Sequence, residues 1–203
     1  MKTRENGRIY YDAAQPKSEK QLLREIAWKS IFHWIYAIVF VVIAFIIFSL
    51  FFKVYRISGE SMKPTFNDGN IVIVSTDEDM IYSVGDIVLA ELEGEAHPIV
   101  KRIVATENQT VEINYQTQEL IVDGVVIQED YISEMTFAPL NEISYPYTVP
   151  EGHVFVLGDN RIDSRDSRNI HIRAIPVENI IGRVSAKVFP VTEFRIISGD
   201  QDA

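Results

Sequence analysis

Hydrophobic positions are distributed very unevenly along this chain of 203 residues. Residues 35–52 read IYAIVFVVIAFIIFSLFF, a run without a charge or a glycine. As a helix this run would be about 27 Å long, at roughly 1.5 Å per residue, which is close to the thickness of a bilayer's hydrocarbon core. A helix that is apolar all round needs either a bilayer or a far larger protein to cover it. The pattern therefore predicts a transmembrane helix over residues 34–52.

We interpret this run as an uncleaved signal-anchor rather than as a cleaved signal peptide. The segment before it is longer than a usual charged n-region, and Phe51–Tyr55 offers no cleavage site of the small-x-small kind. Residues 1–34 carry seven basic and four acidic side chains, for a net charge of +3, whereas residues 35–203 carry a net charge of −13. Because basic flanks stay in the cytoplasm, we expect residues 1–33 to be a cytoplasmic tail and residues 53–203 to lie outside. A capping box at Ser18–Gln21 predicts a short amphipathic helix in this tail.

After residue 53 the pattern changes to short β-branched runs between turn residues, which is typical of strands. Asp123-Gly124 stands between two apolar runs and predicts a hairpin. Residues 108–150 are richer in polar and turn residues and look like an insertion. The prediction is a mainly β protein: one transmembrane helix, then an antiparallel β domain with a small inserted β subdomain. The predicted strands lie within residues 70–74, 86–90, 98–105, 119–128, 153–157 and 182–189.

Four segments carry the candidate chemistry: residues 58–65 (SGESMKPT), 85–88 (GDIV), 101–104 (KRIV) and 158–168 (GDNRIDSRDSR). In the first of them, Ser61 follows a turn that contains Gly59, and Pro64 stiffens the exit. Such a loop can hold one hydroxyl rigidly, although most serines in loops of this kind are turn or cap residues. A serine nucleophile also needs a base within hydrogen-bond reach.

Lys101 is a better candidate for this base than any of the four histidines, none of which has an aspartate placed to orient it in a recognisable motif. Alternation puts Ile99, Lys101 and Ile103 on one face of the predicted strand and Arg102 on the other. Burial can lower a lysine pKa by as much as about 3–5 units, and a neutral lysine can accept a serine proton. Periodicity does not tell which face is buried, so a solvated Lys-Arg pair remains the alternative.

The fourth segment is dense in charge, with six charged residues among the eleven of 158–168. By itself it reads as a solvated loop or as an arginine patch for an acidic partner. Its alternating aspartates and arginines could instead tie a loop down by ion pairs. Ser164 could then hydrogen-bond the lysine amine and aim its lone pair at Ser61.

Composition excludes several other chemistries. The chain has no cysteine, so a disulfide scaffold, a thiolate zinc site, an iron–sulfur site and a cysteine nucleophile are ruled out. No pair of histidines has the spacing H-x-x-x-H, which argues against a zinc peptidase. The net charge of −10 argues against a nucleic-acid binder that relies on a broad basic field.

The four segments, in this order and behind a single signal-anchor, resemble those of type I signal peptidases, specifically the short single-span bacterial form. The resemblance covers residues 35–190. It implies that Ser61 is the nucleophile, that Lys101 is the general base and that Ser164 orients the lysine. It also implies ion pairs of Asp159 with Arg102 and of Asp166 with Arg168, and a site loop shaped by Gly59, Met62 and Pro64.

Three positions depart from the family pattern. Gly59 stands where some relatives have a serine that helps to form the oxyanion hole, so this hole is expected to rest on the Ser61 backbone N–H and neighbouring groups. Residues 105–109 (ATENQ) replace the usual Gly-x-Pro-Gly-Asp after the base strand, and residues 169–172 (NIHI) replace a common aromatic-glycine pair. The last two departures would suit a specialised paralogue with a dedicated substrate.

The resemblance implies a membrane-bound serine endopeptidase that removes signal peptides from exported precursors after an Ala-x-Ala pattern. It implies no metal or organic cofactor. The implied partners are signal peptides, the lipid bilayer and the protein-export channel, without nucleic acid, and the implied location is the cell membrane. Two alternatives are a self-cleaving repressor protease, whose DNA-binding helices are absent here, and a non-catalytic assembly factor for surface polymers such as pili. The intact Ser61, Lys101 and Ser164 argue against the second.

A last expectation concerns large apolar residues near the site. Met62, Phe66 and Phe137 fall in segments with little predicted core to join. We expect some of them to form an exposed patch that touches the outer leaflet, the alternative being that they pack in the β core.

Overall fold

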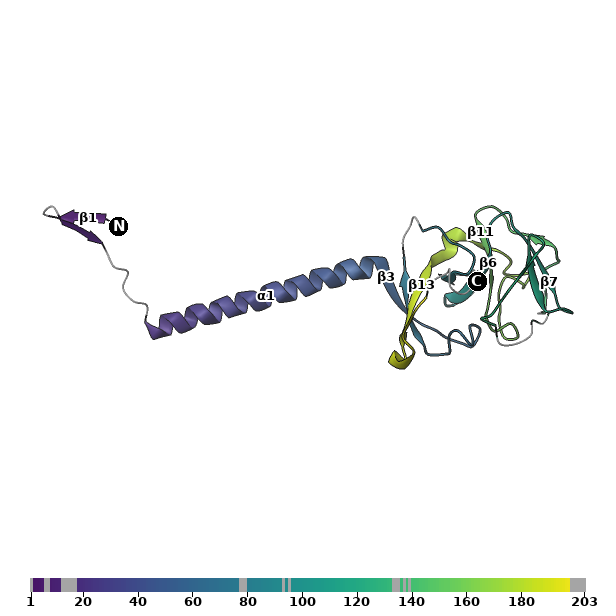
Figure 1. The fold of residues 1–203 in the computed structure, drawn as a ribbon, viewed down its shortest axis with the longest axis horizontal. Coiled ribbons are helices and arrows are strands. Elements are labelled where there is room, and N and C mark those ends of the chain that lie inside the picture. The colour runs from purple at the N-terminus through teal and green to yellow at the C-terminus, as the bar shows by residue number, and fades with distance from the viewer. Residues whose placement is uncertain are drawn as a thin grey trace. The chain divides into compact units, whose positions relative to one another are not determined.

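The computed structural model describes residues 2–5, 8–11, 18–76, 80–92, 94, 96–132, 136, 138 and 140–197. The chain divides into two compact units, Met1–Phe48 and Ser49–Ala203 (Figure 1). The first unit holds an antiparallel pair of strands, β1 (Lys2–Glu5) and β2 (Arg8–Tyr11), and most of the helix α1 (Glu19–Phe51). The second unit holds the remaining strands.

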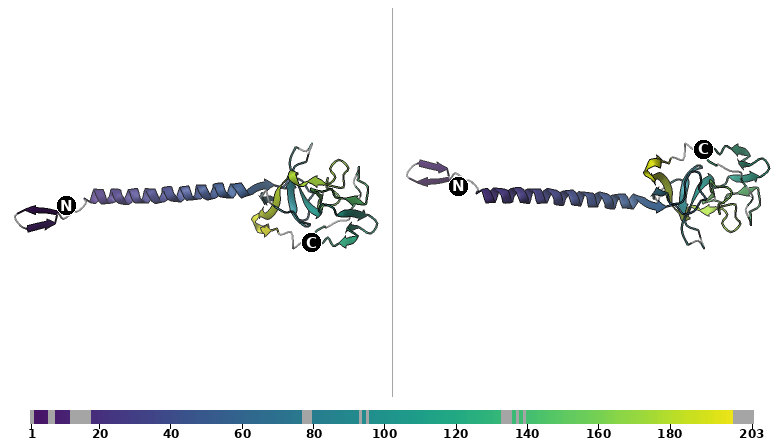
Figure 2. Two further views of the ribbon diagram at one scale, coloured as in Figure 1. Left: turned by 90° about the horizontal axis from the view of Figure 1, so that it is seen from above. Right: turned by 90° about the horizontal axis from the view of Figure 1, so that it is seen from below.

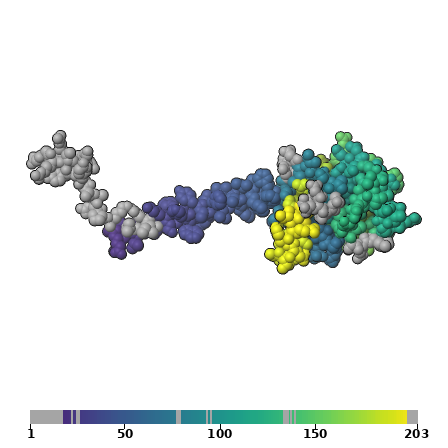
Figure 3. Space-filling view, viewed as in Figure 1, coloured from purple at the N-terminus to yellow at the C-terminus, as the bar shows by residue number. Residues whose placement is uncertain are grey.

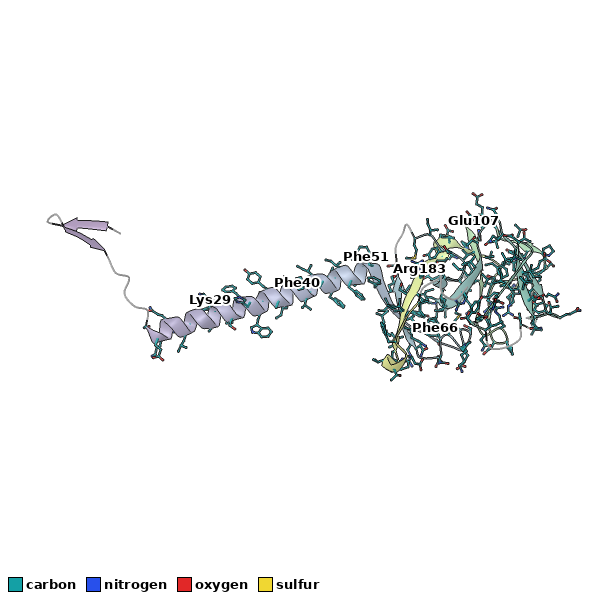
Figure 4. The ribbon with its side chains drawn as sticks, in the orientation of Figure 1. Lys29, Phe40, Phe51, Phe66, Glu107 and Arg183 are labelled. Carbon is teal, nitrogen blue, oxygen red and sulfur yellow. The ribbon has the colours of Figure 1, made fainter. Side chains whose placement is uncertain are left out.

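Helix α1 begins at the predicted capping box. The backbone N–H of Ser18 donates to the Gln21 side chain, and the backbone N–H of Gln21 donates to Ser18 Oγ at 3.4 Å. From Ala27 to Phe51 the helix has a mean hydropathy of 2.8, and none of the most apolar stretch is buried by protein. Its large side chains project all round the axis (Figure 4). By length and composition it can cross a membrane.

The second unit is built on an antiparallel sheet, as the alternating sequence pattern predicts. Figure 2 shows this sheet from two opposite sides. The strand order is β12-β11-β6-β5-β13-β4-β3, and β14 pairs with β13. The strands are β3 (Phe52–Arg56), β4 (Ile71–Ser75), β5 (Ile87–Ala90), β6 (Ile99–Ala105), β11 (His153–Leu157), β12 (Ile175–Pro176), β13 (Ile180–Phe189) and β14 (Arg195–Ile196), with 3₁₀ turns η1 (Val177–Asn179) and η2 (Val191–Glu193).

A second, smaller sheet lies within residues 108–150 of the sequence, between β6 and β11. Its strand order is β10-β7-β8-β9, formed by β7 (Thr110–Asn114), β8 (Glu119–Val122), β9 (Val125–Ile127) and β10 (Tyr147–Thr148). The predicted hairpin joins β8 to β9, and both Asp123 and Gly124 adopt the positive φ angles that such a turn requires. The protein is therefore mainly β with an inserted β subdomain, as predicted.

Burial is divided among three clusters, and the strand β5 shows how the main sheet produces two of them. Ile87 and Leu89 pack into one cluster, while Val88 and Ala90 pack into the other, because successive side chains point to opposite faces of a sheet. A third cluster joins the small sheet to β6 and β11, where Val111 and Leu120 meet Phe155. The sheet is thus covered on both faces.

The expectation of an exposed patch at Met62 and Phe66 is wrong. Both side chains are fully buried, and they pack with Ile87 and Leu89 beneath the loop that joins β3 to β4. Phe137 lies outside the described residues. Exposed apolar side chains gather instead on the C-terminal segment, drawn in yellow on the surface in Figure 3, at Phe189, Val191, Phe194 and Ile196.

We predict that Phe66→Ala, at a residue labelled in Figure 4, lowers the free energy of unfolding by about 3–5 kcal/mol, because it opens a cavity in a closed cluster. Phe189→Ala is the matched control, since that ring is half exposed, and it should cost less than about 1 kcal/mol. Denaturant unfolding of the purified full chain in detergent measures both. Equal losses in the two variants would show that Phe66 is not a core residue.

Candidate active site

The Ser61 loop is fixed to the domain from below and from one side. Met62 and Phe66 anchor it in the core, and the backbone N–H of Phe66 donates to the Met62 carbonyl at 2.8 Å. Gly59 has a φ of +92°, in the region that glycine adopts without strain, and its N–H donates to Asp68 Oδ1 at 2.9 Å. Pro64 follows a cis peptide bond. The turn therefore holds the Ser61 hydroxyl in one place.

Lys101 lies on β6, and the structure settles which face of this strand is buried. Both faces are: Lys101 is 4% exposed and its neighbour Arg102 is 1% exposed. The Nζ atom of Lys101 lies 2.7 Å from Ser61 Oγ, and it donates to the carbonyl of Val100 at 2.9 Å. A serine hydroxyl and a buried amine thus meet at hydrogen-bond distance.

Burial lowers the pKa of Lys101 to about 8, because an ammonium ion loses its hydration there. The negative charges of Asp166 and Asp159 oppose this shift, and the positive charge of Arg168 adds to it. Near neutral pH a useful fraction of this lysine is therefore neutral. A neutral amine whose N–H is held by the Val100 carbonyl can offer its lone pair to the Ser61 hydroxyl.

Arg102 turns away from Lys101, as strand alternation requires, and closes a buried ion pair. Its Nε and NH2 groups donate to the two oxygens of Asp159 at 2.9 and 2.8 Å, a bidentate geometry. Its NH1 group donates to the carbonyl of Gly85, in the predicted Gly-Asp-Ile-Val segment. Thr65 Oγ1 donates to the same carboxylate. This cluster ties β6 to the loops on either side of it.

Asp166 and Arg168 form a second buried pair within the segment 158–168. Arg168 Nε donates to Asp166 Oδ1 at 2.8 Å, and the backbone N–H of Gly158 donates to Asp166 Oδ2 at 3.0 Å. Burial alone would raise the pKa of this carboxyl, but the charge and hydrogen bonds of Arg168 hold it below the ordinary value. The segment is therefore tied down by ion pairs rather than solvated.

Ser164 is close to this centre, but it makes no hydrogen bond to Lys101 in the structure. Its Oγ is buried against Gly158, where a Cβ atom would approach it to 2.2 Å and the Ser61 carbonyl to 2.5 Å. Only a glycine at position 158 allows the three segments to approach so closely. The Val100 carbonyl contacts the amine that the sequence argument assigned to Ser164.

Two further residues hold the site together and were not singled out from the sequence. The backbone N–H of Asn160 donates to the Ser61 carbonyl at 3.0 Å, and its side chain donates to the Glu60 carbonyl. Arg161 Nε donates to the Gly158 carbonyl at 3.0 Å. Both lie in the charged segment, so their position in the sequence was the available signal.

An open cleft of about 260 Å³ reaches Ser61 and Lys101, with apolar side chains from Leu92, Ile99 and Ile172 on its walls. A smaller cavity of about 80 Å³ adjoins the same two residues and is lined by Tyr55, Ile57 and Met62 among others. Among the described residues, no three histidine, aspartate or glutamate side chains are grouped so that they could hold a metal ion. The site offers a hydroxyl, an amine and a mostly apolar groove.

Comparison with known proteins decides the family. Residues 31–189 match the family described as signal peptidase, peptidase S26. The chain belongs to this family. Members of it are serine peptidases, and the signal peptidase I membership predicted from the four segments is confirmed. Membership also supports the cleavage of signal peptides as the activity of this S26 peptidase.

The similar proteins are named signal peptidases over most of their length. A signal peptidase I of Bacillus licheniformis is 33% identical over 82% of this chain and 92% of its own. Signal peptidase I T of Bacillus subtilis (strain 168) is 34% identical over 78% of this chain and 84% of its own. A crystal structure of a signal peptidase I from Enterococcus faecalis V583 has a TM-score of 0.42 and 26% identity, covering 51% of this chain and 97% of that one.

We predict that Asp166→Ala lowers the free energy of unfolding by about 3–5 kcal/mol, because it leaves the Arg168 charge buried without this partner. The lowered pKa means that wild-type stabilisation by Asp166 is present above the unfolded pKa of about 3.9 and is lost as the pH falls through the folded value. Asp163→Ala, at an exposed acid of the same loop, is the control. Thermal unfolding that is unchanged in Asp166→Ala would contradict a buried pair.

Proposed function

We propose that this S26 peptidase cleaves signal peptides with Ser61 as nucleophile and Lys101 as general base, while anchored in a membrane by α1. The observation that carries the proposal is the distance of 2.7 Å between Lys101 Nζ and Ser61 Oγ, with the amine buried. A serine with its base at hydrogen-bond distance is the arrangement that nucleophilic catalysis requires.

The reaction follows from these two groups. Neutral Lys101 takes the proton of the Ser61 hydroxyl as Oγ attacks the scissile carbonyl. The Ser61 backbone N–H, with neighbouring groups of the turn, stabilises the oxyanion. Protonated Lys101 then gives its proton to the leaving amine, and an acyl-enzyme remains on Ser61. Lys101, neutral again, removes a proton from the water that hydrolyses the acyl group.

The supporting residues act by fixing these groups in place. The pair Arg102–Asp159 holds β6, the strand that carries the base, and Asp166–Arg168 holds the loop beside it. In this account Ser164 fills the space between that loop and the Ser61 turn and hydrogen-bonds the amine during turnover. Gly59, Met62 and Pro64 shape the turn itself.

The cavities beside Ser61 suit the substrate that the family implies. The smaller one, of about 80 Å³, is large enough for a small side chain but not for a large aromatic one. We infer that it accepts a small residue before the cut, as in an Ala-x-Ala pattern. The substrates are then signal peptides of exported precursors, and the bilayer and the export channel are the expected surroundings.

The anchoring that we propose places residues 1–33 in the cytoplasm, residues 34–52 in the bilayer, and the peptidase domain of residues 53–203, with its insert at 108–150, outside. Its support is the apolar length of α1 and the asymmetry of charge between the two flanks. Protease added to intact cells would digest an exposed C-terminal tag and leave an N-terminal tag untouched. The opposite pattern would reverse the topology.

We predict that Ser61→Ala and Lys101→Ala each abolish cleavage of an Ala-x-Ala precursor by the purified full chain in detergent. Lys101→Arg should also be inactive, because a guanidinium stays protonated and cannot accept the serine proton. Lys63→Ala is the matched control, since this exposed lysine, two residues from the nucleophile, pairs only with Glu60 among the ion pairs described. Wild-type rates in Ser61→Ala or Lys101→Ala would reject the dyad.

The pH dependence follows from the lowered pKa of Lys101. Because only the neutral amine is a base, kcat/KM should rise about tenfold per pH unit below about 8 and then level off. The profile is measured with the precursor peptide under conditions where the chain stays folded. A limb near pH 6.5 would point to a histidine base, and a limb near 10.5 would mean that the amine is solvated.

A further inference from the structure

The segment that leaves the small sheet after β9 reaches two buried arginines of the catalytic domain. Tyr131 lies flat over Arg102, with the guanidinium carbon 3.9 Å from the ring centroid. Glu129 accepts hydrogen bonds from both terminal nitrogens of Arg161, one of them at 2.9 Å. The Tyr131 hydroxyl donates to Glu129 at 2.7 Å, so the two side chains act as one unit.

Both arginines act on the Ser61 site. Arg102 follows the base Lys101 on β6 and holds Asp159. Arg161 holds the Gly158 carbonyl, and Gly158 abuts the Ser61 carbonyl so closely that no Cβ fits between them. The next residue, Asn160, donates its backbone N–H to that Ser61 carbonyl. Movement of the loop 158–161 would therefore move the nucleophile.

Burial makes these contacts strong. The side chains of Arg161 and Glu129 are 1% and 6% exposed, and the Arg102 side chain is 1% exposed. A buried charge that loses its partner is costly, and a cation over an aromatic face gains most where water is excluded. The segment 129–131 thus shields both guanidinium groups from solvent.

We propose, on the basis of the proposed function, that Glu129 and Tyr131 are positioning residues of the active site. They hold Arg161 and Arg102 so that the loop 158–161 stays pressed against the Ser61 turn and water stays away from the Lys101 side of the sheet. The inserted small sheet is in this way part of the catalytic apparatus, although none of its residues lines the cleft at Ser61.

Two measurable consequences follow for the variants Glu129→Gln and Tyr131→Leu. Displacement of the Ser61 turn should lower kcat by roughly ten- to a hundredfold, since misplacement by about 1 Å has that effect, while KM stays within about twofold because the cleft is intact. Entry of water should also weaken the burial that lowers the pKa of Lys101. The limb of the pH profile should then move upward by about half a unit or more.

Other charges near Lys101 stay in place in these variants, so a moved limb reports burial. The groups that face or flank the amine are Arg102 on its own strand, Asp159, Asp166 and Arg168 from the segment after β11, and Glu60, Asp163 and Arg165 around the cleft.

The test is steady-state kinetics of the purified full chain against a precursor peptide, over a range of pH, for Tyr131→Leu, Tyr131→Phe and Glu129→Gln. Tyr131→Phe keeps the ring over Arg102 and should recover most of the activity that Tyr131→Leu loses. Tyr147→Leu is the control, because Tyr147 belongs to the small sheet and packs on Phe155 away from both arginines. It should lower the thermal stability without moving the pH limb.

Each outcome decides between the alternatives. Wild-type kcat and pH limb in folded Tyr131→Leu and Glu129→Gln would overturn the inference, as would an equal shift in Tyr147→Leu. If Glu129→Gln does not fold, the pair Tyr131→Leu and Tyr131→Phe decides alone: the inference predicts loss in the first and recovery in the second. Ser61→Ala is run in the same assay. Activity in that variant rejects the proposed function, whereas its inactivity beside unaffected Tyr131 and Glu129 variants rejects only this inference.

Discussion

The amine of Lys101 is buried beside Ser61, and burial has the largest effect on its pKa. Two carboxylates, Asp166 and Asp159, act in the opposite direction, since their charge favours the ammonium form. Each of these carboxylates is itself paired with a buried arginine. The ion pairs tie the loops down, and pairing reduces the negative field that would otherwise return the lysine to its charged state.

This requirement explains why the site draws on segments far apart in the sequence. The Ser61 turn is fixed by Met62 and Phe66 in the core, Lys101 by the hydrogen-bonding of β6 between β5 and β11, and the loop 158–168 by its own ion pairs. A glycine at position 158 lets the last loop touch the first. Rigid elements hold every member, so the reacting atoms stay within hydrogen-bond distance without substrate.

Pattern alone predicted much of the fold and little of the geometry. The apolar run gave the helix, alternation gave the strands, and Asp123-Gly124 gave a hairpin, because each depends on neighbouring residues. The pairing of Ser61 with Lys101 came from the family resemblance, since both faces of β6 are buried and periodicity could not choose between them. Met62 and Phe66 were placed wrongly because the loop folds back under itself to join the core. Glu129 and Tyr131 gave no signal, because their arginine partners are 27 or more residues away in sequence.

The central claim is that Lys101 is neutral near physiological pH because it is buried beside Ser61. The most direct measurement is an NMR titration of the Lys101 side chain, selectively labelled at Cε and assigned by comparison with Lys101→Met, in the full chain in detergent. The account predicts a titration midpoint near 8, well below that of exposed Lys63 in the same sample. A Lys101 midpoint near 10.5, together with that of Lys63, would contradict it.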